Sequence, residues 1–220
     1  MTEKEGIVHE EDYRGYRIHL HFDDWPDSPR EWGNLGTIIY KHPRYSLGDI
    51  QIGGRDSEFA TVDDARDFIN RDDVISLPVY CYEHGAITIN TSGYSCPWDS
   101  GQCGWIFVTK ERLRKEYGVQ RISKKIIETA LEVMREEIKT FDTYIRGDVL
   151  GWEVLDKEDT DLPLESCWGY YSEEDALTDA HDCVDWMVKR ALKEGVQPPL
   201  PTLEVHFPDL PDWTLNPEVA

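Results

Sequence analysis

Polar and hydrophobic residues alternate along several short segments of this chain, which is the pattern of β-strands with one buried face. The alternation is strict along residues 16–22, so His19 and His21 are expected to face solvent on the side away from the core. The residues expected to face the core are Ile18, Leu20 and Phe22. Residues 1–12, before this strand, form a polar leader.

Similar patterns predict strands at 36–40, 75–82, 86–91, 104–108, 149–155 and 164–171. The turn 83–85 contains a glycine and has the length of a hairpin connection, so the two strands beside it are expected to pair. The acidic loop 156–161 would join a second hairpin.

Four segments show apolar residues at helical spacing, each preceded by a hydroxyl side chain that can cap a helix. The expected N-caps are Thr61, Thr109, Ser123 and Ser172, with helices running to about 70, 117, 146 and 192. The longest helix, 123–146, is expected to be the central packing element, and Gly147 would end it.

Strands and helices that follow one another without a regular βαβα alternation favour an α+β fold, with an antiparallel or mixed sheet and helices packed on one side. We expect a single α+β domain over residues 1–195, followed by a Pro-rich C-terminal tail over 196–220. The tail also contains apolar residues, so it is expected to pack across the body or hold a partner. These are Leu203, Val205, Phe207, Leu210 and Trp213.

The composition is strongly acidic, with 44 Asp and Glu residues against 23 Lys and Arg and a formal net charge of −21. Such a charge repels nucleic acids and anionic membranes, so proteins that normally hold polyanions become the expected partners. Simple solubility is the other explanation for the acidity. An interaction with nucleic acid itself is not expected.

The charge is segregated along the sequence, which suggests two surfaces with different partners, or two that meet each other. Residues 148–185 contain 13 acidic side chains against Lys157, a balance of −12, whereas residues 110–125 have a balance of +5. The acidic residues expected to bind a partner are Asp156, Glu158, Asp159, Asp161, Glu173, Glu174, Asp175, Asp179 and Asp182.

The five cysteines form no CxxC pair, and the chain start has no apolar signal-like region. A reducing compartment is the simplest setting, so we expect the protein in the cytoplasm of the cell that makes it. No run approaches the roughly 18 apolar residues of a membrane span, so no membrane association is expected.

The loop 95–105 concentrates uncommon residues ahead of an apolar strand. Cys96 as nucleophile, His84 as base and Asp99 as orienting group would make a hydrolase, because a thiolate needs an imidazole partner held in one tautomer. No family-specific nucleophile signature accompanies them. A tightly turned, buried loop with cysteines as small core residues is the competing interpretation.

Zinc is a second alternative, since Cys81, His84, Cys96, Cys103 and Cys167 lie in or beside predicted strands. Structural zinc sites usually show two close pairs of ligands, and this sequence has at most one. No metal and no cofactor are therefore predicted.

Tryptophans in several loops and strands indicate a third alternative, an aromatic pocket that stacks a base or nucleotide. The basic stretch 110–125 would then neutralise a phosphate, although no Gly-rich phosphate loop is present. Core packing is the competing explanation for most of these rings. The candidate tryptophans are Trp25, Trp32, Trp98, Trp105 and Trp168.

Four segments carry a resemblance: Ser28–Thr37, His42–Asp49, Ser95–Gln102 and Ser166–Gly169. Together they resemble a family of uncharacterised proteins common in bacteriophage and mobile-element genomes, over roughly residues 15–172. The family has no established activity that can be transferred to a residue. The long tail after residue 193 and Cys103 depart from its pattern.

This resemblance implies a setting in which small acidic proteins often inhibit restriction or CRISPR systems. We therefore expect a phage-encoded inhibitor, more a binding protein than an enzyme, that blocks a basic nucleic-acid-binding host protein in the host cytoplasm. DNA mimicry is one way it would act, because closely spaced carboxylates can replace DNA phosphates. A nucleotide-binding sponge and the Cys/His hydrolase remain alternatives, and a homodimer is left open.

Overall fold

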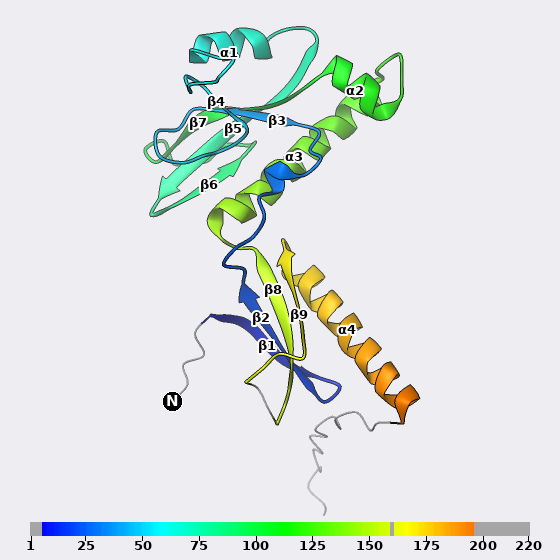
Figure 1. The fold of residues 1–220 in the computed structure, drawn as a ribbon. Coiled ribbons are helices and arrows are strands. Elements are labelled where there is room, and N and C mark those ends of the chain that lie inside the picture. The colour runs from blue at the N-terminus through cyan, green and yellow to red at the C-terminus, as the bar shows by residue number, and fades with distance from the viewer. Residues whose placement is uncertain (1–5, 159–160, 196–220) are drawn as a thin grey trace, which may run out of the picture.

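The computed structural model describes residues 6–158 and 161–195, which form two β-sheets and four α-helices (Figure 1). The predicted α+β class is confirmed, with one antiparallel and one mixed sheet. The predicted tail, 196–220, and Asp159 lie outside the described residues. None of the helices in the described part of the chain combines the length and the apolarity that a membrane crossing requires.

The larger sheet, called here the large sheet, has five strands in the order β4-β3-β7-β5-β6. β4 is parallel to β3, and the other neighbours are antiparallel. The predicted hairpin is present, and Gly85 alone forms its turn, in the left-handed region. The strands are β3 (Thr37–Tyr40), β4 (Ile50–Gln51), β5 (Val74–His84), β6 (Ala86–Asn90) and β7 (Ser100–Thr109).

A helix covers each face of the large sheet (Figure 1). α3 (Lys124–Arg146) packs on the face that carries Ile106 and Val108, and α1 (Val62–Ile69) packs on the face of Phe107. Three consecutive positions of β7 are apolar because both of its sides are buried. The prediction that helices pack on one side of the sheet is therefore not correct for the large sheet, although it holds for the second sheet described below.

The predicted helix starts are confirmed. The hydroxyls of Thr61, Thr109, Ser123 and Ser172 each accept a hydrogen bond from a backbone N–H in the first turn, as N-caps do. They begin α1, α2 (Lys110–Tyr117), α3 and α4 (Glu173–Glu194).

The second sheet, called here the small sheet, is antiparallel in the order β1-β2-β8-β9, and α4 packs on one of its faces (Figure 1). Its core joins Ile18 and Val154 to Ala176, Ala180 and Val184 of the helix. The strands are β1 (Ile7–Tyr13), β2 (Tyr16–Phe22), β8 (Leu150–Asp156) and β9 (Glu165–Tyr170).

β1 corrects the interpretation of residues 1–12 as a polar leader. On the face below α4, His9 Nδ1 lies 3.6 Å from a Glu173 carboxylate oxygen, and Glu11 pairs with His181. His9 and Glu11 thus have polar partners on α4, a helix that is close in space but far away in the sequence. Local periodicity does not reveal such a pairing, because it comes from tertiary structure.

The face of the small sheet away from α4 carries His19 and His21, as the alternation predicts. They are not simply solvated, since their side chains are 13% and 22% exposed and lie 3.5 Å from Glu10 and 3.4 Å from Glu153. Phe22, predicted to be in the core, is 48% exposed because it is the last residue of β2, where the chain leaves the sheet.

The two sheets keep separate hydrophobic clusters, and the chain passes between them after β2 and again before β8. At this junction the N–H of Asp23 donates to the carbonyl of Val149 at 2.8 Å. The hydroxyl of Tyr171 donates to the carbonyl of Asp27 at 3.1 Å. The prediction of one domain over residues 1–195 stays a prediction.

Candidate functional site

A cavity of about 670 Å³ lies at the junction of the two sheets. The connection after β2 supplies one wall, the residue after the short 3-10 helix η1 (Pro29–Glu31) supplies a second, and the end of β9 supplies the third. We call it the aromatic–acidic pocket. Its lining residues are Asp23, Asp24, Trp25, Asp27, Trp32, Trp168, Gly169 and Tyr171.

The aromatic walls of this pocket are exposed. Trp25 is 92% exposed, Trp32 51% and Trp168 44%. The rings of Trp32 and Tyr171 meet edge to face, with centroids 5.4 Å apart and planes at 82°. Faces of indole rings that stay uncovered in the folded protein are available to a ligand.

Trp168 is positioned by the absence of a side chain at Gly151 on β8. A Cβ atom at that position would overlap the indole ring. The ring therefore lies directly over the backbone of β8, and its centroid is 6.4 Å from that of His21.

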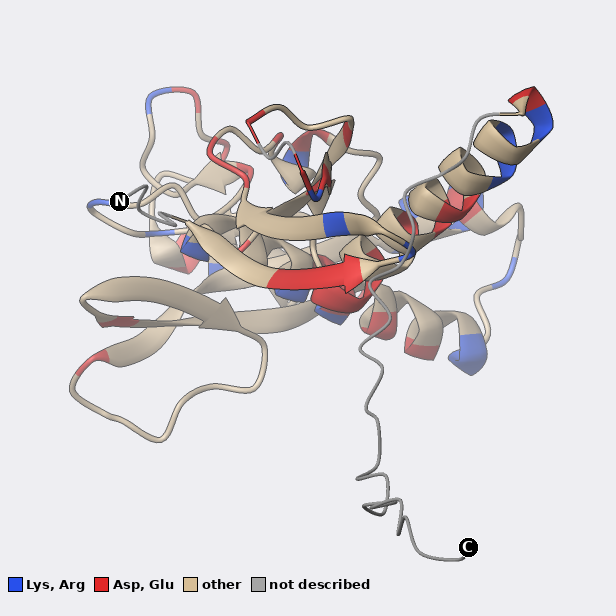
Figure 2. Cartoon of the chain, turned by 90° about the horizontal axis from the view of Figure 1, so that it is seen from below, with Lys and Arg blue, Asp and Glu red and all other residues tan. Residues whose placement is uncertain are grey.

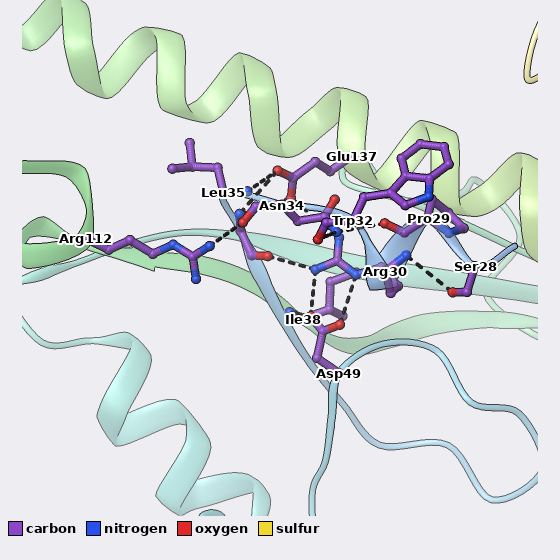
Figure 3. A network of polar contacts seen from close by, with 11 residues as sticks. Ser28, Pro29, Arg30, Trp32, Asn34, Leu35, Ile38, Asp49, Arg112 and Glu137 are labelled. Atoms are coloured by element: carbon purple, nitrogen blue, oxygen red, sulfur yellow. Dashed lines mark hydrogen bonds and ion pairs between the residues drawn. The ribbon is translucent and has the colours of Figure 1, made fainter. Parts of the chain in front are cut away.

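Trp32 is positioned by a buried charge cluster, called here the Arg30 clamp (Figure 3). The Arg30 guanidinium is only 9% exposed and binds both carboxylate oxygens of Asp49, at 3.0 and 2.7 Å, and the carbonyl of Gly36 at 2.8 Å. Glu137 on α3 accepts from the N–H of Leu35 at 2.6 Å. The loop 28–36 is thereby fixed to the large sheet.

Asn34 connects Trp32 to this clamp. Its side-chain amide donates to the carbonyl of Trp32 at 3.1 Å and to that of Pro29 at 2.8 Å, and its own carbonyl accepts from Arg112 (Figure 3). A loop held by this many hydrogen bonds loses little conformational freedom when a ligand binds.

The electrostatic character of the pocket is negative. Three of the eight lining residues are aspartates, and none is Lys or Arg. Burial, with Tyr144 and Asp23 nearby, raises the pKa of Tyr171 to about 12, so its hydroxyl stays a neutral donor. Aromatic faces combined with carboxylates attract cations and disfavour phosphates.

An adjoining cavity of about 470 Å³ shares Asp23 and Asp24 with the pocket, and Arg146 is the basic residue in its lining. Its guanidinium lies 2.5 Å from Asp148 and 3.7 Å from Asp142. These two carboxylates already balance its charge, so the adjoining cavity also offers little to a phosphate.

The structure brings together three of the five tryptophans proposed for an aromatic pocket, Trp25, Trp32 and Trp168. Trp98 is 91% exposed and does not line it, and Trp105 lines a different cavity. The three aspartates of the pocket were not singled out in the sequence analysis. Their signal is local, because Asp23-Asp24-Trp25-Pro26-Asp27 interleaves acids with an aromatic ring.

The acidic residues predicted to bind a partner lie elsewhere, on β8, the following loop and α4, and none of those described lines the pocket. Asp179 accepts from the indole of Trp152 at 3.1 Å and from the hydroxyl of Tyr170, and Asp156 accepts from a backbone N–H. Glu158, Asp161, Glu173, Glu174, Asp175 and Asp182 are exposed.

Charge on α4 is divided along its length, with acidic residues towards its start and basic residues near its end (Figure 2). Acids in the first turn and a lysine in the last one also complement the helix dipole. Part of this acidity therefore stabilises the helix whether or not a partner binds.

The three proposed catalytic side chains do lie close together, but their arrangement differs from the predicted one, in which His84 stands between Cys96 and Asp99. Asp99 lies between the other two, 3.2 Å from His84 Nδ1 and 3.9 Å from the Cys96 thiol. A carboxylate beside a thiol opposes thiolate formation, whereas nucleophilic catalysis requires the imidazole there. The hydrolase hypothesis is therefore not favoured.

The candidate zinc ligands do not all lie together in the structure. Cys167 lies on β9 of the small sheet, while Cys81, Cys96, Cys103 and His84 belong to the large sheet and its loops. Within the described ranges, no group of three or more His, Cys, Asp or Glu side chains is arranged to hold a metal ion.

The segments that carry the phage-family resemblance contribute to the site, since Ser28–Thr37 holds Trp32 and the Arg30 clamp, and Ser166–Gly169 holds Trp168. The resemblance itself stays a prediction. No family model, no curated protein and no solved structure matches this chain.

Proposed function

We propose that this chain is a binding protein for a basic partner protein, and that the aromatic–acidic pocket receives a Lys or Arg side chain of that partner. The observation that carries the proposal is the lining of the pocket, three tryptophans and a tyrosine with three aspartates and no basic residue. A cation over an indole face gains about 0.5–2 kcal/mol, and a nearby carboxylate adds to this.

Three tryptophans and a tyrosine would also suit a nucleotide base, but its phosphates would then lie close to three carboxylates. Like charges in a partly enclosed site repel strongly. The lining thus favours a cationic ligand over the nucleotide signal considered as an alternative.

The partner class that we propose is a nucleic-acid-binding protein of a bacterial defence system, with this chain as a phage-encoded inhibitor. Support comes from the formal net charge of −21 and from the exposed acids of α4, which suit a groove that otherwise holds phosphates. The pocket would add a contact that does not depend on net charge alone.

The test is a titration of the protein with arginine-rich and lysine-rich peptides, in which calorimetry measures the binding affinity at low and at high salt. Trp32→Ala and Trp168→Ala should each weaken binding about 5- to 30-fold, which corresponds to about 1–2 kcal/mol per ring. Trp98→Ala is the matched control, because Trp98 is exposed and outside the pocket.

Two results would contradict the proposal. Equal loss of affinity in all three tryptophan variants would mean that the pocket has no special role. Binding of cyclic or ADP-ribose-like nucleotides in preference to the peptides would assign the pocket to an anionic ligand instead.

A further inference from the structure

The outer edges of the two sheets differ in whether they are closed. At β6 in the large sheet, Asp142 of α3 accepts hydrogen bonds from the N–H of Ile89 at 2.6 Å and from the hydroxyl of Thr88 at 2.7 Å. β4, at the opposite edge, has only two residues. Short edges and edges capped by side chains cannot pair with another chain.

In the small sheet, β1 is also an unsuitable edge. Its pairing with β2 is interrupted between Ile7 and His9, and it directs charged side chains under α4. Irregular register and inward charges are common ways to block edge pairing.

β9 pairs with β8 in regular register from Glu165 to Trp168, and its register shifts only at Gly169, near the end of the strand. In the sheet it neighbours only β8, and its first five residues, 165–169, are all exposed, whichever face they belong to. A strand exposed on both faces and paired on one side presents alternate N–H and C=O groups outward. β9 is therefore the most accessible edge among the described residues.

This edge leads directly into the aromatic–acidic pocket, because Trp168 and Gly169 belong to both. Side chains directly opposite one another on paired strands have Cβ atoms about 5 Å apart. A Lys or Arg opposite Trp168 on an added strand would thus lie within reach of the three aspartates.

The charge of the possible ligands decides which of them suits the edge of β9. A second copy of the chain would bring a formal charge of −21 against the same charge, and residues 196–220 contain four acidic residues and no Lys or Arg. A basic segment is the complementary ligand, since β9 begins at Glu165 and ends beside the aspartates of the pocket.

We propose that β9 is a docking edge to which an extended basic segment of the partner protein adds as a fifth strand, with the basic side chain opposite Trp168 directed towards the pocket. Main-chain hydrogen bonds would give affinity and the pocket would give specificity, as in other strand-addition complexes. This inference rests on the proposed function, because that function supplies the basic partner.

The experiment uses the full chain and a decapeptide of alternating Arg and Thr. In an extended strand, residues that share a face also share an edge for their N–H groups. Two peptides are therefore compared with the parent, one N-methylated at the Arg residues and one at the Thr residues. Only one of them should lose affinity, by at least about tenfold, because only one set of N–H groups faces β9.

Hydrogen exchange gives a second readout. Binding of the parent peptide should slow exchange in residues 165–168 of β9, and a decapeptide of alternating Glu and Thr should neither bind nor slow it. Protection confined to the large sheet would overturn the proposal.

The remaining outcomes separate the two proposals. If both methylated peptides bind as well as the parent, or lose affinity equally, the edge is not used, while a loss of binding in Trp168→Ala would still support the pocket. If the parent peptide does not bind the wild-type protein at all, both proposals are wrong.

Discussion

The two sheets of this chain are closed to different degrees. The large sheet has a helix on each face, a capped edge at β6 and a two-residue edge at β4. The small sheet has a helix on one face, polar histidines and glutamates on the other and an accessible edge at β9. Closure of one sheet suits a rigid support, and openness of the other suits contact with a partner.

The two regions also use charge differently. In the large sheet the Arg30 guanidinium is enclosed by Asp49 and Glu137, so its charge is balanced inside the protein. In the aromatic–acidic pocket three aspartates face a cavity with no Lys or Arg in its lining. The first arrangement stabilises the fold, and the second leaves negative charge for a ligand to neutralise.

The largest effect is expected from Arg30→Ala. The substitution would leave the carboxylates of Asp49 and Glu137 without their cation in a largely buried site, and breaking such a pair costs about 3–5 kcal/mol. The free energy of unfolding, measured by urea denaturation, should fall by that amount. Peptide binding should weaken as well, because Trp32 loses its support.

Arg71→Ala is the matched control. Arg71 pairs with Asp73, but both side chains are more than half exposed, and exposed pairs contribute at most about 1 kcal/mol. If the two substitutions destabilised the protein equally, the large sheet would not depend on the Arg30 clamp.

A smaller effect, centred on the small sheet, is expected from Gly151→Ala. The new methyl group would displace the Trp168 ring, and overpacking of this kind costs about 1–3 kcal/mol. Binding of the Arg-Thr peptide should weaken markedly while the large sheet stays intact. Gly101→Ala, with open space around the added methyl group, is the control and should leave binding unchanged.

Local patterns predicted most of the secondary structure. Thr61 and Ser172 were recognisable as caps, and the strands beside Gly85 as a hairpin, because these signals involve neighbouring residues. β1 was missed since the partners of His9 and Glu11 lie on α4, far away in sequence. The division into two sheets likewise depends on long-range pairing.

The candidate site was predicted only in part. Trp25, Trp32 and Trp168 were recognised as aromatic candidates, but Trp98 could be separated from them only by the tertiary fold. The acidic interface was predicted in the acid-rich stretch 148–185, so Asp23 and the neighbouring aspartates of the pocket were missed. Charge density along a sequence does not show which carboxylates share a cavity.

The smallest expected effect concerns pH and the open face of the small sheet. Burial lowers the pKa of His19 below the ordinary value for histidine, about 6.5, and the positive Arg17 and neighbouring His21 act in the same direction. Glu10 and Glu153 oppose this shift without cancelling it. At pH values below about 6.5 the unfolded chain therefore binds more protons at this position than the native protein.

Stability contributed by His19 is consequently present at neutral pH and is lost as the pH falls from about 7 towards 5. His19→Gln removes the titrating group, so its free energy of unfolding should fall less steeply over this range than that of the wild type. If the wild type and His19→Gln showed parallel slopes, burial of His19 would not lower its pKa on folding, and this explanation of the pH dependence would be wrong.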